Sequence, residues 1–158
     1  MLQHPRIPAL AALAVTLALG SLFFWLGSAK SNATPNFSAS RQASIEQLEL
    51  AIANSTADAT TWFFYGERLR ETGRFSHAAQ AYRKVLESEP YHREARFHCA
   101  LSLAQSGNGD EFFAFMDDVT RNFAKMAVDI FERREVAQYL SQQRFQEMRR
   151  EAQNLAMD

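Results

Sequence analysis

Hydrophobic residues recur every three or four positions along most of residues 42–158, which is the spacing of one face of an α-helix. Trp62, Tyr65 and Leu69 lie at i, i+3 and i+7, and charged residues occupy the faces between them. Gly73 follows, and glycine readily takes the left-handed conformation that ends helices. The pattern therefore predicts an amphipathic helix that ends at Gly73.

The next helix is predicted to begin near Ser76. It is expected to end beside Glu89, because Pro90 disfavours helix for the residue before it. The inner face of this second helix combines small and large apolar residues at spacings of three and four: Ala78, Ala81, Tyr82 and Val85. Its two alanines let the backbones of the two helices approach each other closely.

This pair of helices resembles the tetratricopeptide repeat, a helix–turn–helix unit of about 34 residues. The resemblance is carried by Trp62, Gly66, Leu69, Gly73, Phe75, Ala78, Tyr82 and Pro90. It implies an all-α fold whose repeat core consists of Trp62, Tyr65, Gly66, Leu69, Gly73, Ala78, Tyr82 and Pro90. Tetratricopeptide proteins are scaffolds for peptides and complexes, so the resemblance also implies a binding protein that is not an enzyme and needs no cofactor.

Shifting the repeat frame by 34 residues predicts further helices on both sides. Shifted back, residues 42–54 become a capping half-repeat with Ser44 in the small inner position. Shifted forward, residues 93–124 become a second repeat, in which Phe112 replaces a small residue. Either its helices pair more widely, or the repeat frame slips by one or two residues there.

Beyond residue 124 the pattern predicts one more helix and then a last helix over residues 142–156, with Ser141 as its N-cap. The inward residues of the last helix would be Phe145, Met148 and Leu155. Repeat stacks need such capping elements because their internal faces are apolar. The sequence therefore predicts an all-α domain of about two repeats with capping helices over residues 42–158.

Residues 7–27 are apolar and carry no charge, after a short N-terminal tail of residues 1–6. A helix of this length spans about 31 Å, which matches a hydrocarbon core of about 30 Å. The segment is predicted to be a transmembrane helix that serves as a signal anchor. Residues 28–41, rich in Ser, Asn and Ala, are predicted to be a flexible linker.

The short tail favours a single-pass protein with its N-terminus in the cytoplasm and its helical domain on the exported side, which is the periplasm in a bacterium. The alternative is a secretory signal peptide cut after Ala29, which would release a soluble periplasmic protein.

In tetratricopeptide families the first helix of each repeat lines a concave surface that holds the bound peptide. The matching positions here are Phe63, Glu67, Arg70, Glu71, Phe97, Leu101 and Gln105. Phe63 and Phe97 occupy the same repeat position, and together they would form an apolar platform with a charged rim for a protein or peptide partner. The alternative is that the chain's own C-terminal helix fills this groove and makes both phenylalanines core residues.

Composition argues against other kinds of chemistry. The formal net charge of −1 offers no field that favours nucleic acid. His98 and Cys99 are neighbours on a helix and point about 100° apart, so they do not form a metal site. No glycine-rich phosphate loop is present, and no catalytic set can be assembled. The sequence thus predicts no metal, cofactor, nucleic acid or small-molecule substrate.

Residues 45–90 further resemble the soluble domain of bacterial cytochrome c maturation factors, through a Trp-initiated repeat with Gly-Arg-Phe and Ala-Ala-x-Ala-Tyr. That likeness implies an assembly factor that holds the C-terminal segment of an apocytochrome for haem attachment. Two alternatives are a structural accessory subunit of a membrane protein complex and a mitochondrial import receptor with a similar layout.

Overall fold

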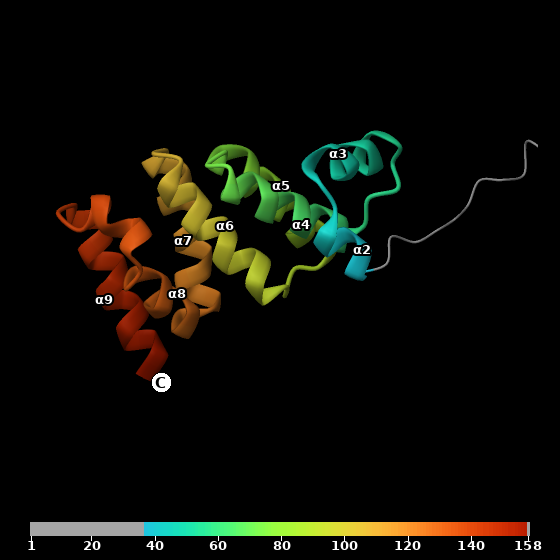
Figure 1. Cartoon of the computed structure of the whole chain (residues 1–158). Coiled ribbons are helices and arrows are strands. Elements are labelled where there is room, and N and C mark those ends of the chain that lie inside the picture. The colour runs from blue at the N-terminus through green and yellow to red at the C-terminus, as the bar shows by residue number, and fades with distance from the viewer. Residues whose placement is uncertain (1–36, 158) are drawn as a thin grey trace, which may run out of the picture. The chain divides into compact units, whose positions relative to one another are not determined.

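The computed structural model describes residues 37–157. The predicted tail, transmembrane helix and most of the linker lie outside these residues. The described part is entirely helical and contains no strand, which confirms the predicted all-α class (Figure 1). Within it, no helix combines the length and the apolar character needed to cross a bilayer.

Successive helices of residues 37–157 follow one another in a row, so that each packs chiefly on its neighbours in sequence (Figure 1). They are α2 (Phe37–Gln42), α3 (Ile45–Ala53), α4 (Ala59–Glu71), α5 (Phe75–Ser88), α6 (Arg93–Gln105), α7 (Gly109–Asn122), α8 (Ala124–Phe131), the 3₁₀ helix η1 (Arg134–Tyr139) and α9 (Gln143–Met157). The helix α2 lies at the end of the stretch, residues 28–41, for which the sequence predicts a linker.

Helices α4 and α5 pack closely along their lengths. Asp58 caps α4, because its carboxylate accepts a hydrogen bond from the Thr61 N–H at 2.8 Å. Between the helices Gly73 has a φ of +75°, the left-handed conformation that the sequence predicts. Gly66 faces Tyr82 so closely that a Cβ there would lie 2.7 Å from the ring. The absence of a side chain at Gly66 thus sets the separation of the two helices.

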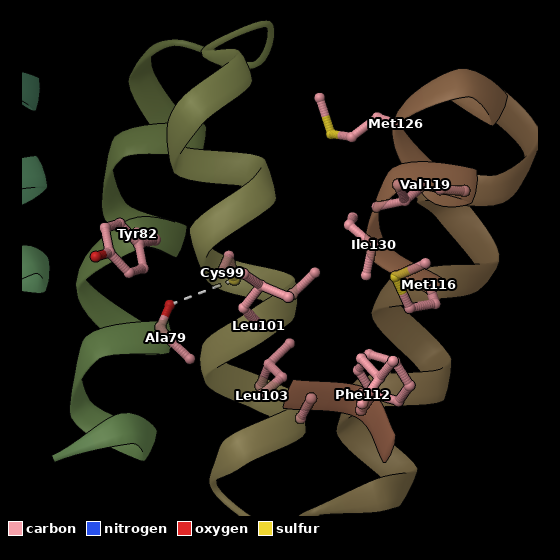
Figure 2. Packing of buried hydrophobic residues seen from close by; sticks show 14 of the residues in the cluster. Ala79, Tyr82, Cys99, Leu101, Leu103, Phe112, Met116, Val119, Met126 and Ile130 are labelled. Atoms are coloured by element: carbon pink, nitrogen blue, oxygen red, sulfur yellow. Dashed lines mark hydrogen bonds between the residues drawn. The ribbon is translucent and has the colours of Figure 1, made fainter. Parts of the chain in front are cut away.

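Helices α6 and α7 lie within the stretch predicted for the second repeat, but they approach each other over a shorter stretch than α4 and α5. Phe112 and Met116 of α7 are fully buried in the space between α6 and the helices that follow (Figure 2). The shorter stretch of close approach is in the direction expected from Phe112. One continuous core runs from Leu69 of α4 to Ala152 of α9.

The capping half-repeat predicted over residues 42–54 differs from the structure in its first residues. Ser44 is exposed and is the N-cap of α3, where its hydroxyl accepts from the Gln47 N–H and the Gln47 side chain accepts from the Ser44 N–H. Leu48, one turn further on, is buried instead. The prediction of an inner position for Ser44 is wrong, because a serine at this place satisfies free N–H groups of the helix.

The C-terminal region also departs from the prediction in detail. A run of charged residues at 132–135 interrupts the apolar spacing, and α8 is followed by the 3₁₀ helix η1 instead of continuing. The last helix begins at Gln143, so Gln142 and not Ser141 precedes it. Leu155 is 42% exposed, whereas Ala152 is buried.

Candidate functional site

A hollow with a volume of about 600 Å³ lies beside α4, between α2 and the start of α6. We call it the α4 hollow. Phe63 and Phe64 supply the apolar part of its lining. Its polar lining includes Arg41, Glu67, Arg68, Glu71, His92 and Glu94. The hollow thus combines an aromatic surface with charges of both signs.

Phe63 is the centre of an aromatic cluster. Its ring lies 5.1 Å from the His92 ring and 6.1 Å from the His98 ring, and both imidazoles are nearly parallel to it, at 24° and 21°. The Tyr82 ring is 5.9 Å away. These contacts hold the half-buried Phe63 ring in place while part of it remains open to the hollow.

Glu67 joins three helices through one carboxylate. It accepts hydrogen bonds from Tyr82 Oη of α5 at 2.5 Å, from His98 Nδ1 of α6 at 2.5 Å and from Arg70 Nη2 of α4 at 3.1 Å. Because a carboxylate only accepts, His98 must carry its proton on Nδ1 in this contact. The side chain of Glu67 is 20% exposed, so this network lies at the edge of the hollow.

Burial is the largest single influence on the pKa of Glu67 and raises it, but the three hydrogen bonds together outweigh burial and lower the pKa to about 2. Burial and the neighbouring carboxylate both raise the pKa of Tyr82 well above its usual value of 10. Glu67 is therefore ionised and Tyr82 is neutral at ordinary pH. Each has the protonation state of a fixed hydrogen-bond partner and not that of a proton-transfer group.

The structure brings together only part of the predicted groove. Phe63, Glu67 and Glu71 line the α4 hollow, and Arg70 is held by Glu67 beside it. The predicted positions on α6 (Phe97, Leu101 and Gln105) are absent from this lining. Leu101 is only 5% exposed and belongs to the core, so its assignment to a partner-binding surface is wrong (Figure 2).

The C-terminal part of the chain covers α6. The Arg133 guanidinium lies 5.7 Å from the centre of the Phe97 ring. Gln138 and Tyr139 of η1 both donate hydrogen bonds to the backbone carbonyl of Ala104. Arg133 and η1 therefore cover part of α6, whereas the alternative left open by the sequence was filling of the groove by the C-terminal helix.

His98 and Cys99 point to different neighbours. His98 bonds Glu67, whereas the Cys99 Sγ lies 3.6 Å from the Ala79 carbonyl oxygen in the core (Figure 2). Burial raises the pKa of the Cys99 thiol to about 12, which keeps it protonated. No group of three or more His, Cys, Asp or Glu side chains in the described residues is arranged to hold a metal ion.

Sequence reasoning missed several residues of the site, above all Arg68 and His92. Arg68 donates to the backbone carbonyls of Arg41 at 2.7 Å and Ala43 at 3.4 Å, and so holds the end of α2 against α4. His92 is the N-cap of α6, a position where Ser, Thr, Asp or Asn is the usual signal. Its place two residues after Pro90, at the predicted start of a helix, is the one feature of the sequence that could have marked it.

No family model, no curated protein and no solved structure matches this chain.

Proposed function

We propose that this chain is a tetratricopeptide-like binding module that holds a segment of a partner protein in the α4 hollow and acts as a scaffold or assembly factor. The helical pair α4–α5 supports the fold assignment. Its Gly66–Tyr82 contact, its turn at Gly73 and its end before Pro90 combine the features that repeats of this kind use to pack helices closely.

The observation that carries the proposal is the α4 hollow with the Phe63 ring in its lining. Its volume of about 600 Å³ lies within the range of ligand sites, roughly 300–1,000 Å³. It is large enough for one or two side chains of a peptide. An apolar surface bordered by charged groups suits a peptide with an apolar anchor and polar neighbours.

The apolar residues 7–27 would tether this module to a membrane, with the helical domain on the exported side. A partner would then be a protein that is exported or assembled at that membrane. The likeness of residues 45–90 to cytochrome c maturation factors makes the C-terminal segment of an apocytochrome the first ligand to test.

Site-specific photo-crosslinking in the native membrane tests the proposal. A photoreactive residue at Glu71, in the lining of the hollow, should form an adduct with the partner. The same residue at Gln80, exposed on α5 and outside that lining, should form none. Replacing Phe63 by Ala should reduce the adduct at Glu71 by about tenfold or more, since aromatic anchors contribute about 2 kcal/mol or more.

A matched control is Phe75→Ala, because Phe75 is also half-buried but lies outside the lining of the hollow. Both variants should keep the helical circular dichroism spectrum, and only Phe63→Ala should lose the partner. An adduct at Glu71 that persists undiminished in a folded Phe63→Ala protein would show that the partner does not use the hollow.

A further inference from the structure

The Nδ1 atom of His92 has two possible neighbours that it cannot serve in the same protonation state. It accepts a hydrogen bond from the Ala95 N–H at 3.2 Å and so caps α6. An imidazole nitrogen accepts only when it carries no proton. The same Nδ1 lies 3.6 Å from the Glu94 carboxylate, a contact that becomes favourable only when the ring is protonated.

The His92 ring is also part of the α4 hollow. It stacks on Phe63 with 5.1 Å between the ring centres, and its side chain is 24% exposed, so water reaches it. A rotation of this imidazole would therefore change the lining of the hollow and the beginning of α6 together.

The surroundings determine where a protonated ring would turn. The charged or titratable groups around the hollow are Arg41, Glu67, Arg68, Glu71, Glu94 and His98. Glu71 is paired with Arg68 at 2.6 Å, and Glu67 is held by its three donors. Glu94 is the carboxylate closest to Nδ1, and its side chain is 67% exposed and free to adjust.

We propose that partner binding in the α4 hollow is controlled by pH through His92. This inference rests on the proposed function of the hollow. A proton from solvent binds the lone pair of Nδ1, the Ala95 N–H loses its acceptor and bonds to water, and the ring adjusts so that its new N–H meets the Glu94 carboxylate, 3.6 Å away. Histidine is the residue type that switches charge near neutral pH, and this rearrangement alters the lining of the hollow, so the strength of partner binding changes with pH.

The switch can be tested without a partner by NMR of the full chain, ¹⁵N-labelled and in detergent micelles, between pH 8 and pH 5.5. The ¹⁵N chemical shifts of the His92 side chain should show a proton on Nε2 alone at high pH and on both nitrogens at low pH. The protection factor of the Ala95 amide, corrected for the intrinsic exchange rate at each pH, should fall about fivefold with the same midpoint. This size corresponds to the loss of an N-cap of about 1 kcal/mol.

Two variants distinguish the effect of protonating His92 from the effect of protonating other groups. His92→Asp keeps an N-cap acceptor that stays ionised throughout this interval, so its Ala95 protection should not depend on pH. His77→Gln changes an exposed histidine of α5 outside the hollow and should behave as the wild type.

Constant Ala95 protection while His92 gains its second proton would overturn the switch, and so would a pH response that survives in His92→Asp. If Ala95 responds but the Glu71 adduct yield does not change with pH, control of binding is refuted although the cap responds. Failure of the proposed function looks different, because the Glu71 adduct is then absent at every pH while the Ala95 response remains.

Discussion

At the scale of single residues, Glu67 decides how the first helices fit together. Its carboxylate receives donors from α4, α5 and α6, and one of them belongs to Tyr82, whose side chain is fully buried. Hydrogen bonds to a charged acceptor are stronger than those between neutral groups, about 1.5–3 kcal/mol each. Removing the carboxylate leaves three donors that face no acceptor of comparable strength.

We expect Glu67→Gln to lower the free energy of unfolding by about 2–4 kcal/mol, because the amide keeps the volume but places an NH₂ group among donors. Urea unfolding followed by circular dichroism measures this change. The control is Glu71→Gln on the same helix, whose side chain is 54% exposed and pairs only with Arg68, and its cost should stay below about 0.5 kcal/mol. Equal losses in the two variants would contradict the role given to Glu67.

The lowered pKa of Glu67 also predicts how stability depends on pH. The pKa of its carboxyl is about 2 in the folded chain against an ordinary 4.5, so folding favours the ionised form. The resulting stabilisation, about 2–3 kcal/mol, is fully present above about pH 4.5 and is lost as pH falls toward 2. The difference in unfolding free energy between wild type and Glu67→Gln should therefore shrink from pH 6 to pH 3. A constant difference over that range would show that the carboxyl titrates normally.

This network could not be predicted from the sequence. Glu67 lies among charged residues of an amphipathic helix, where a glutamate is usually solvated. Its contact with His98 joins positions 31 residues apart. Such a contact depends on how far α6 is rotated about its own axis. The spacing of apolar residues does not define that rotation closely enough to predict an individual hydrogen bond.

At the scale of helices, α4 and α5 approach each other closely where Gly66 faces the Tyr82 ring. Tyr82 has no room to move, because its ring is fully buried and its hydroxyl bonds Glu67. A methyl group at position 66 would have to push α4 and α5 apart. The glycine is required here by packing and not by its backbone conformation.

We expect Gly66→Ala to cost about 1–3 kcal/mol of stability through overpacking, although alanine is favoured over glycine inside helices by about 1 kcal/mol. Thermal unfolding measures the net effect. In a Tyr82→Leu background, which removes the ring, the same change should become neutral or stabilising. A loss of equal size in both backgrounds would mean that the Tyr82 ring is not the obstacle.

The sequence predicted these helices well wherever glycine or proline marks an end. Gly73 has the expected left-handed conformation, and α5 ends at Ser88, with Glu89 as its C-cap just before Pro90. The prediction was weaker after residue 124, because short helices joined by charged residues leave no long apolar period to read. The inward position assigned to Leu155 was also wrong: it lies in the last turn of α9 and is 42% exposed, although Phe145 and Met148 of the same helix are buried as expected.

At the scale of the whole described domain, the helices pack mainly on their neighbours in sequence, and the C-terminal end closes over α6. Phe145 of α9 is fully buried, and its ring contacts that of Phe131 of α8 edge-on at 5.0 Å. In such an arrangement a local defect weakens the adjacent helices more than distant ones.

We expect Phe145→Ala to cost about 3–5 kcal/mol in the C-terminal helices, because it leaves a large cavity. Native-state hydrogen exchange should show amide protection falling at least a hundredfold in α8 and α9 and much less in α4 and α5. The N-terminal helices are the internal control. A uniform loss of protection along residues 37–157 would mean that the domain unfolds as one cooperative unit.

Arg133, Gln138 and Tyr139 cover part of α6, and this bears on how fast a partner would dissociate. A partner that binds in the α4 hollow, as proposed, would touch a small area, and contacts of this size go with weak affinity, on the order of micromolar. Weak complexes separate quickly, because differences in affinity lie mostly in the dissociation rate. If the proposed function holds, such a short contact would suit brief holding and transfer of a partner, while permanent retention would require a second point of attachment.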